Sequence, residues 1–123
     1  MNSYQLVNRT KKFAIDVIKF FQKLPRTDEA RIVGKQLLRS STSVAANYRA
    51  ACRARSRQEF YAKICIVVEE VDESLFWLEL LKESGIGDTE VTEQFINEAQ
   101  ELVRIFSSTR KSTRDHLSKS VNQ

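Results

Sequence analysis

The sequence predicts an all-α protein folded as an antiparallel up-down-up-down four-helix bundle. Apolar residues recur at alternating spacings of three and four along most of the 123 residues, which is the period of one helix face. Only three glycines and one proline are present, too few for the turns of a β-sandwich or barrel. A hydrophobic fraction of 41% with 29% charged residues is typical of a folded chain.

The first two predicted helices are separated by a proline. The first covers residues 4–24 and ends before Pro25, because the residue before a proline disfavours helical dihedrals. The second begins after Thr27, a good N-cap, with Asp28 and Glu29 where the helix dipole favours negative charge. The expected core face of the first helix carries Leu6, Thr10, Phe13, Val17, Phe20 and Leu24.

A break is predicted in the long stretch that follows. No glycine or proline occurs between residues 35 and 84, yet a single helix over the stretch that begins at Asp28 would be about 85 Å long. That length does not fit a compact chain of this size. Ser56 and Glu59 have the spacing of a capping box, so we place the break at residues 53–56. The third helix then carries the seam Phe60, Ile64, Val67, Val71, Ser74, Leu78 and Leu81.

The fourth predicted helix follows a glycine-containing turn. Gly85 suits the left-handed position after a helix end, and Asp88 or Thr89 caps the next helix. The apolar face of this fourth helix is expected to end at residues 107–112, and residues 113–123 are expected to form a polar, frayed tail. We therefore expect a bundle domain over residues 1–112 and a tail over 113–123. The seam of this helix is Val91, Phe95, Ala99, Leu102 and Phe106.

Composition argues against several classes of protein. The longest apolar run, residues 64–68, is far shorter than the roughly 18 residues that cross a bilayer. The N-terminus has no signal-peptide pattern, so we expect a cytoplasmic protein that does not enter a membrane. Cys52 and Cys65 do not match a metal spacing, and free thiols are expected. With His116 as the one histidine, no metal, cofactor or catalytic residue is expected.

Charge is divided sharply along the chain. Residues 1–57 carry 13 basic and 3 acidic side chains, whereas residues 58–103 carry 2 basic and 12 acidic ones. The last twenty residues add 5 basic and 1 acidic. This division predicts either halves that pack on each other or separate faces that meet different partners.

A cationic row is predicted on the second helix. At 100° per residue, its members share an arc of about 80° opposite the apolar face, and no acidic residue lies inside that arc to neutralise the row. Rows of cations on a rigid helix suit phosphates or carboxylates, so the row is predicted to bind nucleic acid or an acidic protein. A solvated outer face is the alternative. The row consists of Arg31, Lys35, Arg39, Arg49 and Arg53.

An oligomer interface is predicted on the third helix. Ile66, Trp77 and Leu80 lie on the side turned away from its seam, and a tryptophan with aliphatic neighbours is typical of a subunit contact. Packing against a loop or the tail of the same chain is the alternative. In a purely structural oligomer, Arg31, Arg39 and Arg49 would instead pair with Glu70, Glu73 or Glu98 of a neighbouring subunit.

Three segments point to a family. The segment at residues 36–49 reads QLLRSSTSVAANYR, residues 55–60 read RSRQEF, and residues 73–78 read ESLFWL. Together they resemble the four-helix bundle proteins encoded by intervening sequences in bacterial 23S ribosomal RNA genes. Many relatives follow the asparagine with Ile-Ala-Glu-Gly, whereas Tyr48-Arg49-Ala50-Ala51 stands here, which is typical of a more basic branch. The resemblance implies a ring, commonly a homopentamer, without established enzymatic activity.

Two further resemblances bear on function. The chain is more distantly similar to the accessory variability protein of diversity-generating retroelements, which implies a pentameric barrel that binds a reverse transcriptase and nucleic acid. Arg110 and His116 resemble the short Arg-x(4–6)-His motif of HEPN-type ribonucleases, the least favoured function. We therefore expect a non-enzymatic, ring-forming bundle that binds RNA or an RNA-handling protein. A structural or protein-interaction oligomer, or an accessory subunit of a reverse transcriptase, is the alternative.

Overall fold

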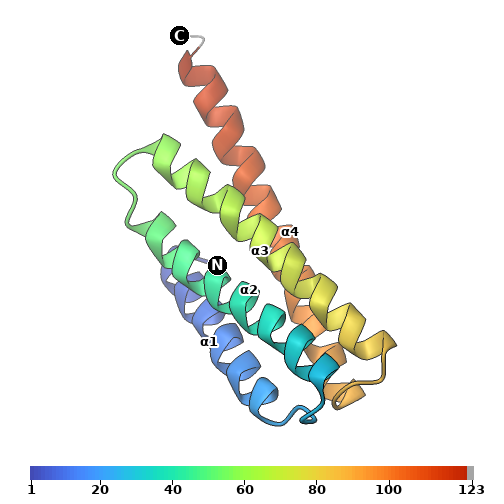
Figure 1. Cartoon of the computed structure of the whole chain (residues 1–123). Coiled ribbons are helices and arrows are strands. Elements are labelled where there is room, and N and C mark those ends of the chain that lie inside the picture. The colour runs from blue at the N-terminus through green and yellow to red at the C-terminus, as the bar shows by residue number, and fades with distance from the viewer. Residues whose placement is uncertain (122–123) are drawn as a thin grey trace.

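The protein is a bundle of four helices joined by short turns. The computed structural model describes residues 1–121. Figure 1 shows consecutive helices running in opposite directions, with α1 packed on α2, α2 on α3 and α3 on α4. The all-α class and the four-helix bundle are thus confirmed. The helices are α1 (Ser3–Gln22), α2 (Asp28–Cys52), α3 (Arg57–Glu83) and α4 (Thr89–Val121).

Each helix begins with a side chain that accepts a hydrogen bond from its first turn, which satisfies an otherwise unpaired backbone N–H. Asn2 and Gln5 cap α1 reciprocally. Thr27 accepts from the third residue of α2, and Ser56 does the same for α3. Asp88 Oδ1 accepts from the Val91 N–H at 3.1 Å in α4. The predicted break at residues 53–56 is confirmed, and Asp88 rather than Thr89 is the fourth cap.

The turn between α3 and α4 depends on a left-handed glycine. Gly85 has a φ of 67°, in the region that residues with a Cβ disfavour. Its N–H donates to the Lys82 carbonyl at 3.1 Å, and the Ile86 N–H donates to the Leu81 carbonyl at 2.9 Å. This paired pattern satisfies the last carbonyls of α3 and stops the helix, so the predicted helix end is confirmed.

One continuous core joins the four helices, and the predicted seams supply it. All six residues predicted for the core face of the first helix are buried, although Leu24 lies two residues beyond the end of α1. Thr10 places its hydroxyl on the Leu6 carbonyl at 2.9 Å. Only Phe60 of the α3 seam is half-buried. Val91 and Phe95 of the α4 seam are half-buried too, whereas the rest of that seam is fully enclosed. The core side chains that are completely buried include Val17, Leu37, Val44, Ile64, Val67, Leu78, Leu102 and Phe106.

The fourth helix is longer than the sequence analysis expects. α4 continues for 33 residues to Val121, so the expected helix end at residues 107–112 is wrong. Without glycine or proline in this stretch nothing stops the helix, and Thr109 and Thr113 place their hydroxyls on carbonyls one turn back. Residues 122 and 123 of the expected tail lie outside the described residues. The domain division at residue 112 stays a prediction.

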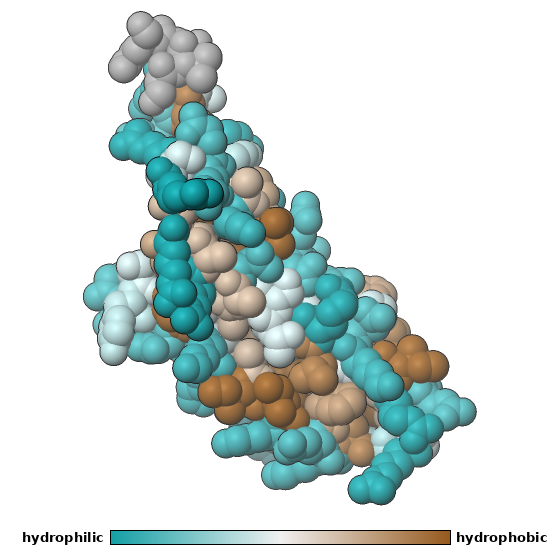
Figure 2. Space-filling model, turned by 60° about the vertical axis from the view of Figure 1, so that its left-hand side comes forward, coloured by the Kyte–Doolittle hydropathy of each residue, from teal (hydrophilic) through white to brown (hydrophobic). Residues whose placement is uncertain are grey.

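The helices are not equally close to one another. The Cα atoms of α1 and α4 stay more than 8 Å apart over their described lengths. Phe95 bridges the gap by contacting Phe13 and Phe20, with ring centroids 6.0 and 5.3 Å apart. Figure 1 shows the last turns of α4 projecting beyond the other helices. In Figure 2 the visible side of this projecting end is mainly hydrophilic, while apolar side chains gather farther down the visible face. No helix within residues 1–121 is long and apolar enough to span a membrane.

Candidate nucleic-acid interface

The cationic row on α2 is interrupted in its middle. Arg39 Nη1 lies 3.0 Å from Glu70 Oε2, and its Nη2 donates to Glu73. The hydrogen bond to Glu73, followed by the charge of Glu70, raises the pKa of Arg39. The expectation that nothing neutralises the row is therefore wrong at Arg39. The carboxylates come from α3 of the same chain, not from a neighbouring subunit.

Small side chains explain why α3 reaches Arg39. Ser74 donates to the Ser40 hydroxyl at 2.8 Å, and both serines are completely buried. Two short side chains in contact bring the helix backbones close together. Because Arg39 is next to Ser40 on α2, this close approach places it over Glu70 and Glu73, which lie one turn before Ser74 and directly beside it.

The other four cations of the row fall into two groups. Arg31 and Lys35 are exposed near the start of α2, where Arg31 pairs with Asp28 at 2.7 Å. Arg49 and Arg53 are exposed at its end. Lys35 and Arg49 are separated by about 21 Å along the helix. The row is therefore two separate pairs with a neutralised position between them.

The second pair belongs to a larger group of cations that we call the basic end. It comprises the α2–α3 turn and the C-terminal part of α4, which lie at the same end of the molecule in Figure 1. All of its side chains are exposed except that of Arg110, which is half-buried. The group is Arg49, Arg53, Arg55, Arg57, Arg110, Lys111, Arg114 and Lys119.

Tyr61 shows how close the two parts of the basic end are. The pKa of the Tyr61 phenol is raised, mainly by its hydrogen bond with the Cys65 side chain, whereas the charges of Arg114 and Arg110 lower this pKa. The arginines of α4 thus lie within electrostatic range of the first turns of α3. Two acidic residues approach these cations: Glu59 lies 3.7 Å from Arg55, and Asp115 lies 4.0 Å from Arg114. Such exposed pairs are weak, so the basic end keeps a net positive charge.

The predicted Arg-x(4–6)-His pair lies on α4 at the basic end. Arg110 and His116 are six residues apart on one helix, so their side chains point about 120° apart and do not converge on one substrate atom. Within residues 1–121, no group of three histidine, cysteine or carboxylate side chains could hold a metal ion. Clustered arginines offer planar, bidentate donors that match phosphate oxygens.

The predicted interface residues of α3 lie in two environments. Ile66 and Leu80 are each 37% exposed. Trp77 is half-buried against the core, and its buried Nε1 has no hydrogen-bond partner among the described residues. The expectation that Trp77 points away from the core is therefore wrong in part. Phe76, 54% exposed, stacks its edge on the Trp77 ring with centroids 4.9 Å apart.

Two features of the site are absent from the sequence predictions. The basic end combines a turn with a helix segment about 55 residues farther along the chain, and the latter was expected to fray. The surplus of cations in the last twenty residues is the signal that could have found it. Phe76 could have been found from its position on the helix, because it is an apolar residue that lies opposite the α3 seam and among carboxylates.

The fold and charges define a class: a small antiparallel helical bundle with a basic end. The chain belongs to the family of 23S rRNA-intervening sequence proteins, whose model matches residues 2–108. A solved structure from Bacteroides thetaiotaomicron, described as a protein of unknown function from the S23 ribosomal protein family, is 30% identical. The match has a TM-score of 0.80 and covers 90% of this chain and 99% of that chain. No curated protein matches.

Proposed function

We propose that this protein is a non-enzymatic RNA-binding bundle whose RNA surface is the basic end. The observation that carries the proposal is that the α2–α3 turn and the C-terminal part of α4 lie at the same end of the molecule (Figure 1), where both contribute exposed cations and few carboxylates. Arg49 and Arg53 of the cationic row belong to this surface. Arg31 and Lys35 lie at the far end of α2, and Arg39 is occupied by Glu70 and Glu73.

The family description supports RNA over other polyanions. Its members are described as proteins of an intervening sequence in 23S rRNA, a description that associates them with ribosomal RNA genes. The basic end has no row of exposed aromatic side chains on which unpaired bases could stack. We therefore expect contacts to the phosphates of structured RNA, with little sequence preference.

The test is a binding titration of a fluorescent 20-nucleotide RNA hairpin at several salt concentrations. If about four phosphates are contacted, the logarithm of affinity falls with the logarithm of salt with a slope of roughly −3 to −4. Replacing Arg53 and Arg55 with glutamine flattens the slope by nearly two, because each lost phosphate contact removes almost one. Arg110→Gln with Arg114→Gln has the same expected effect.

The matched control replaces Arg31 and Lys35 with glutamine, which removes the same charge from the far end of α2. We expect its slope and affinity to equal those of the unchanged protein. Equal losses for all three double variants would show that net charge, not the basic end, governs binding. A protein that does not bind the hairpin at low salt contradicts the proposal.

We further propose that the protein assembles as a homo-oligomer, a cyclic pentamer being the form that the family resemblance implies. The support is an apolar group on the outer face of α3, where Phe76 joins the predicted Ile66, Trp77 and Leu80. A large exposed aromatic beside aliphatic residues is typical of interface anchors. Such an assembly would serve as a scaffold, and binding of an acidic or RNA-handling protein at the cationic row is the alternative function.

Replacing Phe76 and Leu80 with serine should convert the oligomer to monomer in sedimentation equilibrium at micromolar concentration. These positions are better probes than Trp77, because Trp77 also packs on the core. Ile18→Ser is the control, since Ile18 is 39% exposed on α1, and this variant should keep the oligomer. A native protein that sediments at its chain mass of 14.2 kDa contradicts this proposal.

A further inference from the structure

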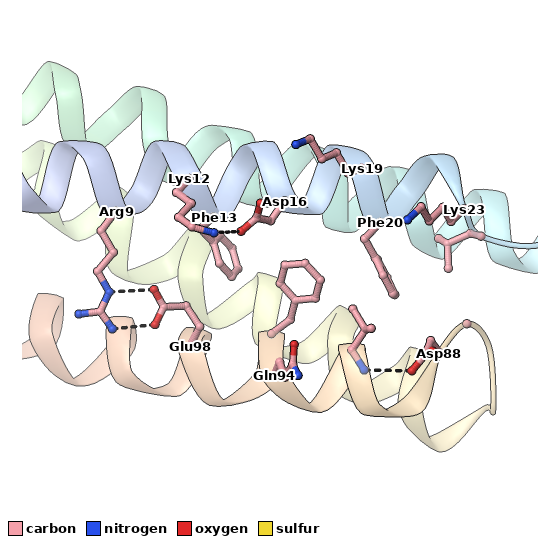
Figure 3. Close-up of a pocket in the computed structure, with 14 residues that line it drawn as sticks. Arg9, Lys12, Phe13, Asp16, Lys19, Phe20, Lys23, Asp88, Gln94 and Glu98 are labelled. Carbon is pink, nitrogen blue, oxygen red and sulfur yellow. Dashed lines mark hydrogen bonds and ion pairs between the residues drawn. The ribbon is translucent and has the colours of Figure 1, made fainter.

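The gap between α1 and α4 contains a groove that no part of the proposed function uses. Its volume is about 590 Å³, within the range of pockets that hold small organic molecules. It exists because the two backbones stay apart while aromatic side chains span only part of the space between them. Figure 3 shows Phe13 and Phe20 extending from α1 across this space.

The floor of the groove is aromatic and aliphatic. Phe95 lies between the other two rings, at interplanar angles of 81° to Phe13 and 60° to Phe20. Leu24 and Val91 extend this apolar surface toward the α3–α4 turn. Phenylalanine edges and faces in such an arrangement can accept a planar ring as a further edge-to-face partner. The floor therefore suits a flat aromatic molecule better than a sugar or a peptide backbone.

Most charges around the groove are already paired. Arg9 makes a two-point contact with Glu98 at 2.8 and 2.6 Å and approaches Glu101 at 3.2 Å. Glu98 is the largest cause of the raised pKa of Arg9. Lys12 pairs with Asp16 at 2.6 Å. These contacts, drawn in Figure 3 for Glu98 and Asp16, leave the middle of the groove without net charge.

The end of the groove near the α3–α4 turn is different. Lys19 and Lys23 line it, and neither has a carboxylate within ion-pair distance among the residues that the structure describes. The nearby Asp88 is occupied as the cap of α4. In Figure 3 the ammonium group of Lys19 points away from α4, so Lys23 is the nearer cation to the aromatic floor. An unpaired ammonium group beside an aromatic floor matches a molecule that has a flat apolar body and one anionic group.

We propose that this groove binds a small aromatic anion, with its ring on Phe13, Phe20 and Phe95 and its carboxylate or sulfonate at Lys23, in the end of the groove that Lys19 also lines. The proposal is independent of RNA binding, because none of these residues belongs to the basic end. Its occupant is a small molecule, and a second copy of the chain in the groove is the competing outcome.

The probe is 1-anilinonaphthalene-8-sulfonate, titrated into the folded protein and followed by fluorescence. We expect one site per chain. Replacing Lys19 and Lys23 with glutamate should weaken binding at least fivefold, because an attractive charge becomes repulsive. Val91→Trp, which fills the apolar floor, should weaken it by a similar factor. Circular dichroism checks that each variant remains folded, and amide shifts of Gly87, Val91 and Gln94 in an NMR titration locate the probe.

Lys11→Glu is the matched control, because Lys11 is an exposed lysine of the same helix that does not line the groove. It should bind the probe as the unchanged protein does. The proposal is wrong if Lys11→Glu weakens binding as much as Lys23→Glu alone, or if the amide shifts map elsewhere. The proposal is also wrong if the probe and the Val91→Trp substitution each dissociate an oligomer. The groove would then be occupied by a second copy of this chain in the oligomer.

Discussion

Phe106→Ala should lower the free energy of unfolding by about 3 to 5 kcal/mol, the cost of removing a large aromatic ring from a closed core. Phe106 is completely buried on α4. Its ring lies 5.0 Å from that of Tyr48 on α2, so the contact crosses the bundle between helices that are not neighbours in sequence. The backbone cannot collapse into the space, because α2, α3 and α4 are fixed by their own packing.

Urea unfolding followed by circular dichroism measures this loss, with the slope against urea expected to stay the same. Tyr4→Ala removes an aromatic ring that is 75% exposed and should change the free energy of unfolding by less than about 1 kcal/mol. A loss below about 1 kcal/mol for Phe106→Ala would mean that α4 does not pack on the core in solution.

Ser74→Leu should lower the free energy of unfolding by about 2 to 3 kcal/mol, because overpacking forces apart helices that meet closely. Ser74 and Ser40 are completely buried with their hydroxyl oxygens 2.8 Å apart, which leaves no room for a branched side chain. Ser74→Ala should cost only about 1 kcal/mol, the net value of a hydrogen bond.

The comparison between the two variants separates volume from hydrogen bonding. Ser108→Leu makes the same chemical change at an exposed position of α4 and should leave the free energy of unfolding nearly unchanged. If Ser74→Leu is as stable as Ser74→Ala, the close approach of α2 and α3 is not what holds Arg39 over Glu70 and Glu73.

Helix positions were predictable because their signals are local. The caps Thr27, Ser56 and Asp88 act on N–H groups three residues away, and Gly85 acts on its own backbone angle. Likewise, the seams on each helix depend only on the 100° step between residues. Where a stop signal was missing, at the end of α4, the low apolar content of the segment led to the wrong helix end.

The sequence predicted only part of the candidate site, because some of its charges interact with charged residues of another helix. The arc that holds Arg39 contains no carboxylate in the sequence of α2, yet α3 supplies two. Similarly, Trp77 lies on the outer side of an ideal helix wheel, but its indole is long enough to pack back on the core. The cytoplasmic location and the RNA partner stay predictions.

The amino-acid sequence by itself determined that this chain forms four helices, where three of them begin and end, and which faces form the core. Spacing, capping and the left-handed Gly85 act within a few residues, so no knowledge of the partner helix is needed. Tertiary structure decided which cations remain free, that α1 and α4 leave a groove, and that Arg49 and Arg53 join the arginines of α4 in one basic end. Those properties depend on distances between helices, which small residues such as Ser40 and Ser74 set through packing.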